Sequence, residues 1–355
     1  MIPYFFIFNL FIIGCLVQYQ FTKYCKIVDL IACVVLVIFL GARYEVGGDW
    51  VGYYFLLQSS ANGQYFNASE PFFLLFTKLS LLLPNAYQYL TLNTLLSMAY
   101  IGSLLFLYRL NLKSKFYTLT KITVLTFPIF IFLLGTGYLR QAVACALFIP
   151  VLHYSKNLDY KKCFLFIFLS LLFHKSAFVF LIVPLLTYLQ NQNFNFNQIN
   201  KKYFLYLFIF INICILFTVK WASAYTNQSM NSYGVFIRYL YILILGLPLI
   251  VIFKNQLFPF CLKYKVQLIV SFTVVIIASY HFSTFIDRLL IYLILPVSYY
   301  SLKYLDESKN QKLLHAYFAI MISLNLIYTF VWLKFSYWGP LKWLPYQNYF
   351  FNNHF

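Results

Sequence analysis

Long runs of apolar residues recur along the whole chain and are separated by short polar stretches that carry most of the charges. Five of these runs extend for about 17 residues or more without a charged side chain. At about 1.5 Å of rise per residue, each is long enough to cross the ~30 Å hydrocarbon core of a membrane. They are residues 4–20, 86–108, 122–139, 266–286 and 313–333. The pattern predicts an all-α, polytopic integral membrane protein with a single transmembrane domain over residues 1–355.

Two segments depart from this pattern. Residues 71–84, PFFLLFTKLSLLLP, are short, are bounded by prolines and contain Lys78, so they predict a re-entrant or interfacial half-helix. Residues 163–189 are long for one helix and carry His174 and Lys175 near their middle, which predicts a broken helix pair. With the shorter apolar runs counted, we expect about 12 transmembrane helices plus the half-helix. The first run lacks a basic start and a small-residue cleavage site, so we interpret it as a retained span.

Composition excludes a soluble globular protein, because 63% of the residues are hydrophobic and only 10% are charged. The net charge of +18 would also suit a nucleic-acid-binding protein. However, the lysines lie between apolar runs and do not form one solvated patch, so we expect no nucleic acid as a partner. The seven cysteines form no C-x-x-C pair and no cluster with histidine at metal-ligand spacing. We interpret them as small core residues and expect no metal and no cofactor.

The distribution of lysine assigns the two sides of the membrane, because short cytoplasmic loops carry the positive excess. The basic loops that we place inside are residues 23–26, 109–121, 156–162, 201–202, 254–265 and 303–312. Both termini then fall outside. The outer segments are a first loop with the half-helix over 43–84, a second loop over 220–236 and a tail over 335–355.

Four of the five arginines fall outside, at the ends of apolar runs. They are Arg43, Arg140, Arg238 and Arg288. One explanation is that they pair with outer acids and hold the bundle together. Those acids are Glu45, Asp49, Glu70 and Asp287. We favour the second explanation, that they bind the phosphates of an anionic lipid-linked substrate. The planar guanidinium can hold a phosphate through two hydrogen bonds and keeps its charge when partly desolvated.

Residues 41–54, GARYEVGGDWVGYY, place two acids and an arginine in a turn-rich aromatic loop directly after an apolar run. Asp49 precedes a predicted helix, so it is either a reactive carboxylate or only the N-cap of that helix. Glu70, before Pro71, is either a sugar contact or only the cap of the half-helix. The pair Gly47 and Gly48 is typical of a tight turn and not of a phosphate loop, because no G-x-G-x-x-G follows.

The histidines and the outer aromatic residues each have two interpretations. His174 is either reactive or a buried histidine of the bundle, and we interpret His281 as a buried histidine of the bundle. All five tryptophans fall on the outer side, and an aromatic belt at the membrane surface explains most of them. Alternatively, Trp50, Tyr53, Tyr54 and Trp221 would stack against sugar rings.

Five fragments, in this order and at these intervals, resemble the EpsG-like family of polysaccharide polymerases, which includes many O-antigen polymerases of the Wzy type. They are RYEVGGDWVGYYFLL, SEPFFLLFTKL, YLRQAVACALFIP, FHKSAFVFLIVPLL and DRLLIYLILP. The resemblance covers roughly residues 40–300. The positions carried over from it are Arg43, Asp49, Glu70, Arg140, Gln141, His174 and Arg288. The chain departs from the commoner family pattern by having Trp50 after Asp49 and Glu45 two residues after Arg43, which leaves open which acid is reactive.

The resemblance implies a glycosyltransferase of the bacterial inner (cytoplasmic) membrane whose active site faces the periplasm. Its substrate would be an undecaprenyl-diphosphate-linked oligosaccharide, and membrane lipid and a chain-length regulator protein are its implied partners. The growing chain would move from its lipid carrier onto the non-reducing end of a new repeat unit. The segments that we place outside would then be periplasmic.

Elementary chemistry assigns roles to the same residues. The departing lipid diphosphate gains negative charge, so fixed cations lower the barrier, and we expect Arg140 and Arg288 to be the main ones, with Arg43 and Arg238 as helpers. The attacking sugar hydroxyl needs a base. Asp49 is the first candidate, followed by His174 and Glu45. The residues expected to contact sugar are Trp50, Tyr53, Glu70, Gln141 and Trp221.

Other functions remain open at this point. A flippase or transporter of lipid-linked oligosaccharide would also have about twelve spans, but the two halves of the chain show no internal repeat. An O-antigen ligase or a membrane acyltransferase would share the outer arginines, and only the resemblance argues against them. The sequence lacks an Asp-x-Asp pair, a G-x-S-x-G elbow, an H-E-x-x-H motif and a nucleotide-binding loop, which disfavours the corresponding enzyme classes.

Overall fold

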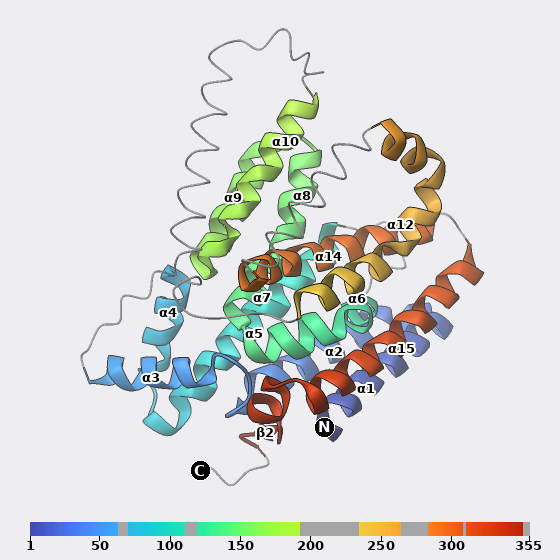
Figure 1. Ribbon diagram of the computed structural model, residues 1–355. Coiled ribbons are helices and arrows are strands. Elements are labelled where there is room, and N and C mark those ends of the chain that lie inside the picture. The colour runs from blue at the N-terminus through green and yellow to red at the C-terminus, as the bar shows by residue number, and fades with distance from the viewer. Residues whose placement is uncertain (63–69, 111–118, 192–233, 264–282, 308–309, 351–355) are drawn as a thin grey trace, which may run out of the picture.

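The computed structural model describes residues 1–62, 70–110, 119–191, 234–263, 283–307 and 310–350 (Figure 1). Several predictions fall outside these ranges. They concern Trp221, His281, the polar linker over 192–200 and residues 220–233 of the second outer loop. The described chain is almost entirely helical, as expected for an all-α membrane protein.

The helices follow one another along the chain with short connections. The N-terminal half holds α1 (Ile2–Gln20), η1 (Thr22–Tyr24), α2 (Cys25–Gly41), α3 (Trp50–Ala61), α4 (Pro71–Ser80), α5 (Asn85–Leu110), α6 (Leu119–Thr126), η2 (Phe127–Gly135), α7 (Leu139–Ala146), α8 (Phe148–Lys156) and α9 (Tyr160–Phe173). The C-terminal half holds η3 (Lys175–Leu181), α10 (Ile182–Asn191), α12 (Val235–Lys263), α14 (Ser283–Glu307), α15 (Gln311–Phe335) and η5 (Gly339–Trp343). Two short strands, β1 (Arg43–Tyr44) and β2 (Gln347–Asn348), complete the described chain.

Three of these helices are long and apolar enough to cross a membrane, and they are Ile2–Gln20, Asn85–Phe106 and Lys312–Phe335. Shorter apolar helices cover Pro71–Ser80, Leu119–Gly135, Lys175–Leu185 and Val235–Val251. The membrane class predicted from composition is thereby confirmed. The segment over 71–84 contains a helix of only 10 residues, α4. The segment over 163–189 is divided at His174 into α9 and the η3–α10 pair.

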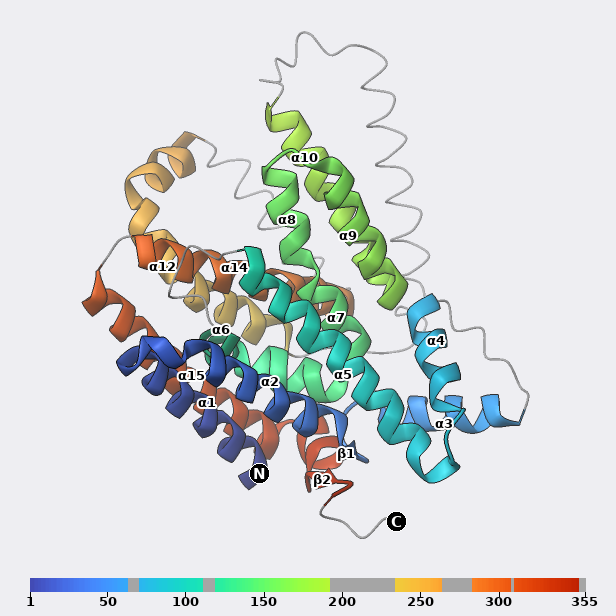
Figure 2. The same ribbon diagram turned by 180° about the vertical axis from the view of Figure 1, so that it is seen from behind.

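The centre of the bundle is the continuous run formed by α6 and η2, in which every residue is buried. Most residues of this run are apolar, so other helices must cover it on all sides. Helices α1, α2, α5, α14 and α15 contact this run, and α7 continues from it (Figures 1 and 2). Helices α9 and α10 both pack against α8, and α8 in turn contacts α5, α7 and α14 (Figure 1).

Pro128 disturbs the hydrogen bonds of the central run, because proline has no N–H to donate to the carbonyl of Val124. The run becomes a π-helix from Phe127 to Gly135. Side chains of other helices supply the missing donors. The amide of Asn325 lies 2.6 Å from the Val124 oxygen, and the Tyr241 hydroxyl lies 2.7 Å from that of Leu125. Such replacement is required where a broken helix is surrounded by apolar groups.

The chain segment after α15 returns to the end of the bundle where α2 ends. β2 pairs with β1 in antiparallel register, with Arg43 opposite Asn348. Trp343 is 2% exposed, and its indole N–H donates to the Thr136 hydroxyl at 2.6 Å. Trp343 therefore belongs to the core and not to an aromatic belt. Trp338, in contrast, is exposed.

Candidate functional site

Arg140 is the second residue of α7 and lies at the centre of a polar cluster. Its Nη1 donates to Oε2 of Glu70 at 3.0 Å, and its Nε donates to the Tyr53 hydroxyl at 3.3 Å. Its Nη2 lies 3.8 Å from Oδ2 of Asp49, and the Tyr53 hydroxyl donates to that same oxygen at 3.3 Å. We call Asp49, Tyr53, Glu70 and Arg140 the Arg140 cluster. It joins three segments that are far apart in the sequence.

Both acids of the cluster occupy the N-cap position of a helix, yet neither side chain caps it. Asp49 precedes α3 and Glu70 precedes α4, and neither makes a side-chain cap hydrogen bond. Both carboxylates are turned towards Arg140 instead. The interpretation of Asp49 and Glu70 as simple helix caps is therefore wrong. Their position still has an electrostatic benefit, because the positive end of a helix dipole stabilises a nearby anion.

Gly47 and Gly48 bring Asp49 to the start of α7. Gly47 has φ +104°, which confirms the tight turn, and a Cβ there would overlap the carbonyl oxygen of Thr136. A Cβ on Gly48 would lie 2.9 Å from the ring of Tyr138. The backbone N–H of Asp49 then donates to the carbonyl of Gly137 at 3.1 Å. The glycine pair thus allows two backbone segments to touch and so sets the distance between Asp49 and Arg140.

The two acids differ in their contact with the surroundings. The side chain of Asp49 is 26% exposed and that of Glu70 is 6% exposed. Desolvation raises the pKa of the Asp49 carboxyl, while the positive charges of Arg140 and Arg288 oppose this shift. The raised pKa makes Asp49 a better proton acceptor than an ordinary aspartate, and its exposure leaves it accessible. Glu70 is the buried counter-ion of Arg140.

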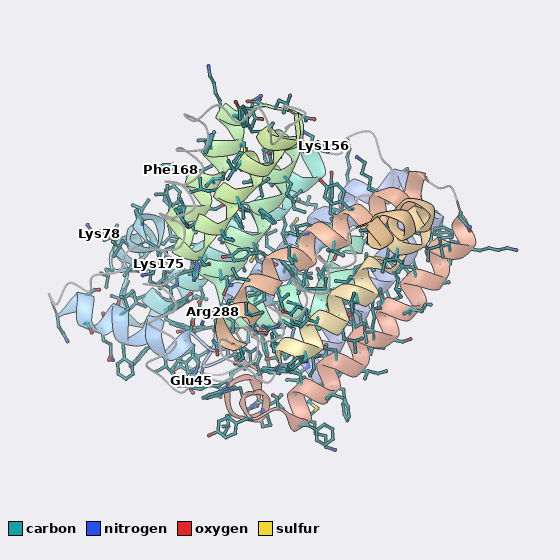
Figure 3. The ribbon with its side chains drawn as sticks, turned by 45° about the horizontal axis from the view of Figure 1, so that its top comes forward. Glu45, Lys78, Lys156, Phe168, Lys175 and Arg288 are labelled. Carbon is teal, nitrogen blue, oxygen red and sulfur yellow. The ribbon has the colours of Figure 1, made fainter. Side chains whose placement is uncertain are left out.

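Arg288, in α14, lies beside the Arg140 cluster. Its guanidinium stacks over the ring of Tyr138 at 5.8 Å, and its backbone carbonyl accepts from the Gln141 amide at 3.5 Å. Its charge acts on both Asp49 and His174. Figure 3 shows Arg288 on the same side of the molecule as Lys175 and Glu45, whereas Lys156 lies at the far end of α8. The region therefore carries several positive charges.

Arg43 has a different environment, because it is only 1% exposed. Its guanidinium donates to the carbonyls of Leu40 at 2.5 Å and Val46 at 3.2 Å, and to the side-chain oxygen of Asn93 at 3.2 Å. Leu40 is in the last turn of α2, so Arg43 neutralises the negative end of that helix. The structure places Arg43 next to the site without bringing it into the Arg140 cluster.

Arg238 and Asp287 form a buried ion pair between α12 and α14. Arg238 also donates to the backbone carbonyl of Asp287 at 3.3 Å. One explanation of the outer arginines was that they pair with outer acids. The structure shows such pairing for Arg238 with Asp287 and for Arg140 with Asp49 and Glu70. Pairing does not exclude phosphate binding, since a guanidinium carries five N–H donors.

His174 separates α9 from η3 and is 9% exposed. Its Nδ1 lies 2.5 Å from the Ser176 hydroxyl and accepts the Ser176 backbone N–H at 3.2 Å. The Ser176 hydroxyl in turn contacts the Tyr292 hydroxyl. Helix α7, which carries Arg140, contacts both α9 and η3, so His174 lies beside the Arg140 cluster. The positive charges of Arg140 and Arg288 act on its ring.

The aromatic candidates for sugar contact are placed unequally. Tyr53 is 2% exposed, and its ring lies against Arg140 and Phe73, so it offers no open face. Trp50 is half-buried, and Tyr54, whose ring is 6.5 Å from that of Trp50, is 41% exposed. Glu45 is exposed in the same loop and has φ 53°. The open aromatic surface therefore lies on the outer side of α3.

Sequence reasoning missed several residues that organise the site, namely Asn93, Phe73, Tyr138, Ser176 and Tyr292. Phe73 packs its ring 4.5 Å from the Arg140 guanidinium. Ser176 and Tyr292 lie inside two of the quoted fragments, next to residues that were selected. Tyr292 lies four residues after Arg288, so both share one face of a helix. This spacing could have indicated that Tyr292 belongs to the site.

In the part of the chain that the structure describes, no three His, Cys, Asp or Glu residues lie together in a way that could hold a metal ion. A model of the EpsG family matches residues 26–348, nearly the whole chain. No curated protein and no solved structure gives a significant match.

Proposed function

We propose that this chain, which belongs to the EpsG family, polymerises oligosaccharide repeat units carried on undecaprenyl diphosphate. EpsG proteins are polysaccharide polymerases, so a role in polysaccharide biosynthesis follows from the family. The lipid-linked donor and the side of the membrane are our proposal. One observation carries the proposal. The accessible carboxylate of Asp49 is held by Arg140, and the charge of a second arginine, Arg288, also acts on it.

The positive charges suit a diphosphate leaving group. As the bond between the anomeric carbon and the diphosphate lengthens, negative charge accumulates on the departing oxygen, and cations already in place stabilise it. We assign Arg140 and Arg288 as the principal contacts. Glu70 and Asp49 orient the Arg140 guanidinium. Arg238 and Arg43 contribute at longer range.

Asp49 is the proposed base. The Arg140 guanidinium and the Tyr53 hydroxyl hold its Oδ2, which leaves Oδ1 to accept the proton of an attacking sugar hydroxyl. The sugar rings would lie against Trp50 and Tyr54, whose faces are more open than that of Tyr53. Glu45 remains an alternative base. Gln141 is only 3% exposed and its amide donates to the Arg288 carbonyl, so we no longer assign it a sugar contact.

The proposal includes a topology. Twelve crossings and one half-helix over 71–84 place the Arg140 cluster, Arg288 and His174 on the periplasmic side of the inner membrane. The lysine-rich loops lie in the cytoplasm, as the positive excess of short loops favours. A chain-length regulator protein is the proposed protein partner.

The test is to delete the gene and to follow surface polysaccharide by gel electrophoresis. We expect the deletion strain to carry single repeat units, and Arg288→Ala and Asp49→Asn to fail to restore long chains although both proteins accumulate. Lys156→Ala, at the far end of α8, is the control and should restore them. If the deletion strain instead accumulates repeat units on the cytoplasmic side, the protein is a flippase. Long chains from both well-expressed variants would refute the site.

A further inference from the structure

The hydrogen bonds of His174 determine which ring nitrogen carries the proton. The Ser176 backbone N–H points at Nδ1 from 3.2 Å. A backbone N–H can only donate, so Nδ1 must be an acceptor and carries no hydrogen. In the neutral ring the proton is therefore on Nε2.

Two hydroxyl groups extend this arrangement into α14. The Ser176 hydroxyl lies 2.5 Å from Nδ1, and since Nδ1 accepts, the hydroxyl donates to it. The same hydroxyl oxygen is then open to accept from Tyr292, with which it is in contact. Ser176 is 4% exposed and Tyr292 is 2% exposed. The ring orientation is thus held by two buried residues from different helices, as second-layer hydrogen bonds hold functional histidines in other proteins.

Nε2 is the accessible nitrogen of the ring. Within the described residues it makes no hydrogen bond, and it is not fully buried. Its surroundings are positive, because the charges of Arg140, Arg288 and Lys175 all act on the ring. A second proton on the ring would add a like charge to this group. A neutral imidazole whose N–H hydrogen-bonds to a substrate oxygen is a known catalytic device.

We propose that Ser176 and Tyr292 are positioning residues that hold His174 as an Nε2–H donor, which hydrogen-bonds to an oxygen of the substrate diphosphate. This role rests on the proposed function. His174 is then not the base that the sequence offered as an alternative to Asp49. As the acceptor oxygen bonds to the anomeric carbon, the electron pair of the broken C–O bond goes to the diphosphate oxygen. The hydroxyl proton goes to Asp49, and the Nε2 proton stays on the ring.

The first experiment measures the tautomer directly. The full-length protein, labelled with ¹⁵N-histidine and purified in detergent, is examined by NMR, and His174→Gln identifies the signals of His174. We expect Nδ1 to show the shift of an unprotonated nitrogen and Nε2 that of a protonated one. This pattern should persist from about pH 8 down to about pH 6. A proton on Nδ1, or on both nitrogens across this range, would overturn the inference.

The second experiment uses amide side chains in the complementation assay. The amide nitrogen of glutamine reaches the place of Nε2, whereas that of asparagine takes the place of Nδ1. We expect His174→Ala and His174→Asn to lower chain polymerisation by about 10²-fold, because each removes one hydrogen-bond donor to a developing anion. His174→Gln should retain much of the polymerisation activity. His153→Gln, at the far end of α8, is the matched control. Glutamine as inactive as alanine, or alanine fully active, would overturn the donor role.

Ser176→Ala and Tyr292→Phe test the positioning role. We expect each to lower polymerisation by about 10-fold or more and to shift the NMR signals of His174 towards a mixture of tautomers. Unchanged signals and unchanged polymerisation in both variants would remove the role. The two experiments also separate this inference from the proposed function. A deletion strain that still makes long chains would refute the polymerase, while the NMR result would still decide the tautomer.

Discussion

Asp49 and Glu70 both pair with Arg140, and the structure predicts that neutralising each has a different effect. Asp49→Asn should lower the rate, and Glu70→Gln should lower the stability. Asp49→Asn keeps the shape of the side chain and its hydrogen bond from Tyr53, so the fold should persist. Loss of a general base costs about 10²-fold to 10⁴-fold in rate. Asp49 is the accessible acid, with 26% of its side chain exposed, so we expect its substitution to abolish long chains at normal protein levels.

Glu70→Gln should mainly affect stability. The Arg140 contact is 3.0 Å, and the Glu70 side chain is only 6% exposed. Removing one partner of a fully buried pair costs about 3–5 kcal/mol. Arg140 is 24% exposed and keeps Asp49 nearby, so we expect a smaller loss, about 1–2 kcal/mol. The polymerisation rate per folded molecule should change less than tenfold.

The assay combines two measurements on the same purified variants. Thermal unfolding in detergent reports stability, and chain extension of lipid-linked repeat units, divided by the folded fraction, reports rate. The expected result is a crossed pattern, with Asp49→Asn stable and inactive and Glu70→Gln less stable and active. The reverse pattern, an active Asp49→Asn with an inactive but stable Glu70→Gln, would refute the assignment of the base.

Three further predictions concern pH, the central helix and Arg43. Because Asp49 must be ionised to act as base and its pKa is raised, the rate should fall on acidification already above the usual pKa of aspartate. The small residual rate of Asp49→Asn should not show this fall. Asn325→Leu removes the amide that donates to the Val124 and Leu125 carbonyls, so we expect the free energy of unfolding to fall by about 1–3 kcal/mol. Thermal unfolding measures this loss, with Asn157→Leu at the bundle end as the control. Arg43→Lys keeps the charge but cannot serve three acceptors in one plane, so the yield of folded protein should drop, and a normal yield would contradict the structural role of Arg43.

The helices of this protein follow from local chemistry, which explains why much of the fold was predictable. Runs of apolar residues have no stable state in a membrane other than a helix, because backbone groups find no water there. The predicted spans over 4–20, 86–108 and 313–333 agree with α1, α5 and α15. The break at His174 was also visible, as a charged residue beside a histidine within an apolar run. The pairing of β1 with β2 was not, because a contact across 300 residues leaves no local pattern.

The sequence by itself determined the membrane class and the family, since composition, periodicity and motif order can be read along the chain. For the site it offered candidate residues. Only the tertiary structure decided what each charged side chain does. Asp49 and Glu70 look like two helix caps in the sequence, yet both turn to Arg140, because three helices begin beside one another. The sequence predicts that Arg43 and Arg288 both act on the diphosphate, Arg43 as a helper, and it does not show the surroundings of either. One is enclosed by carbonyl oxygens and the other reaches the site, because the energy of an ion depends on the neighbours that folding brings to it.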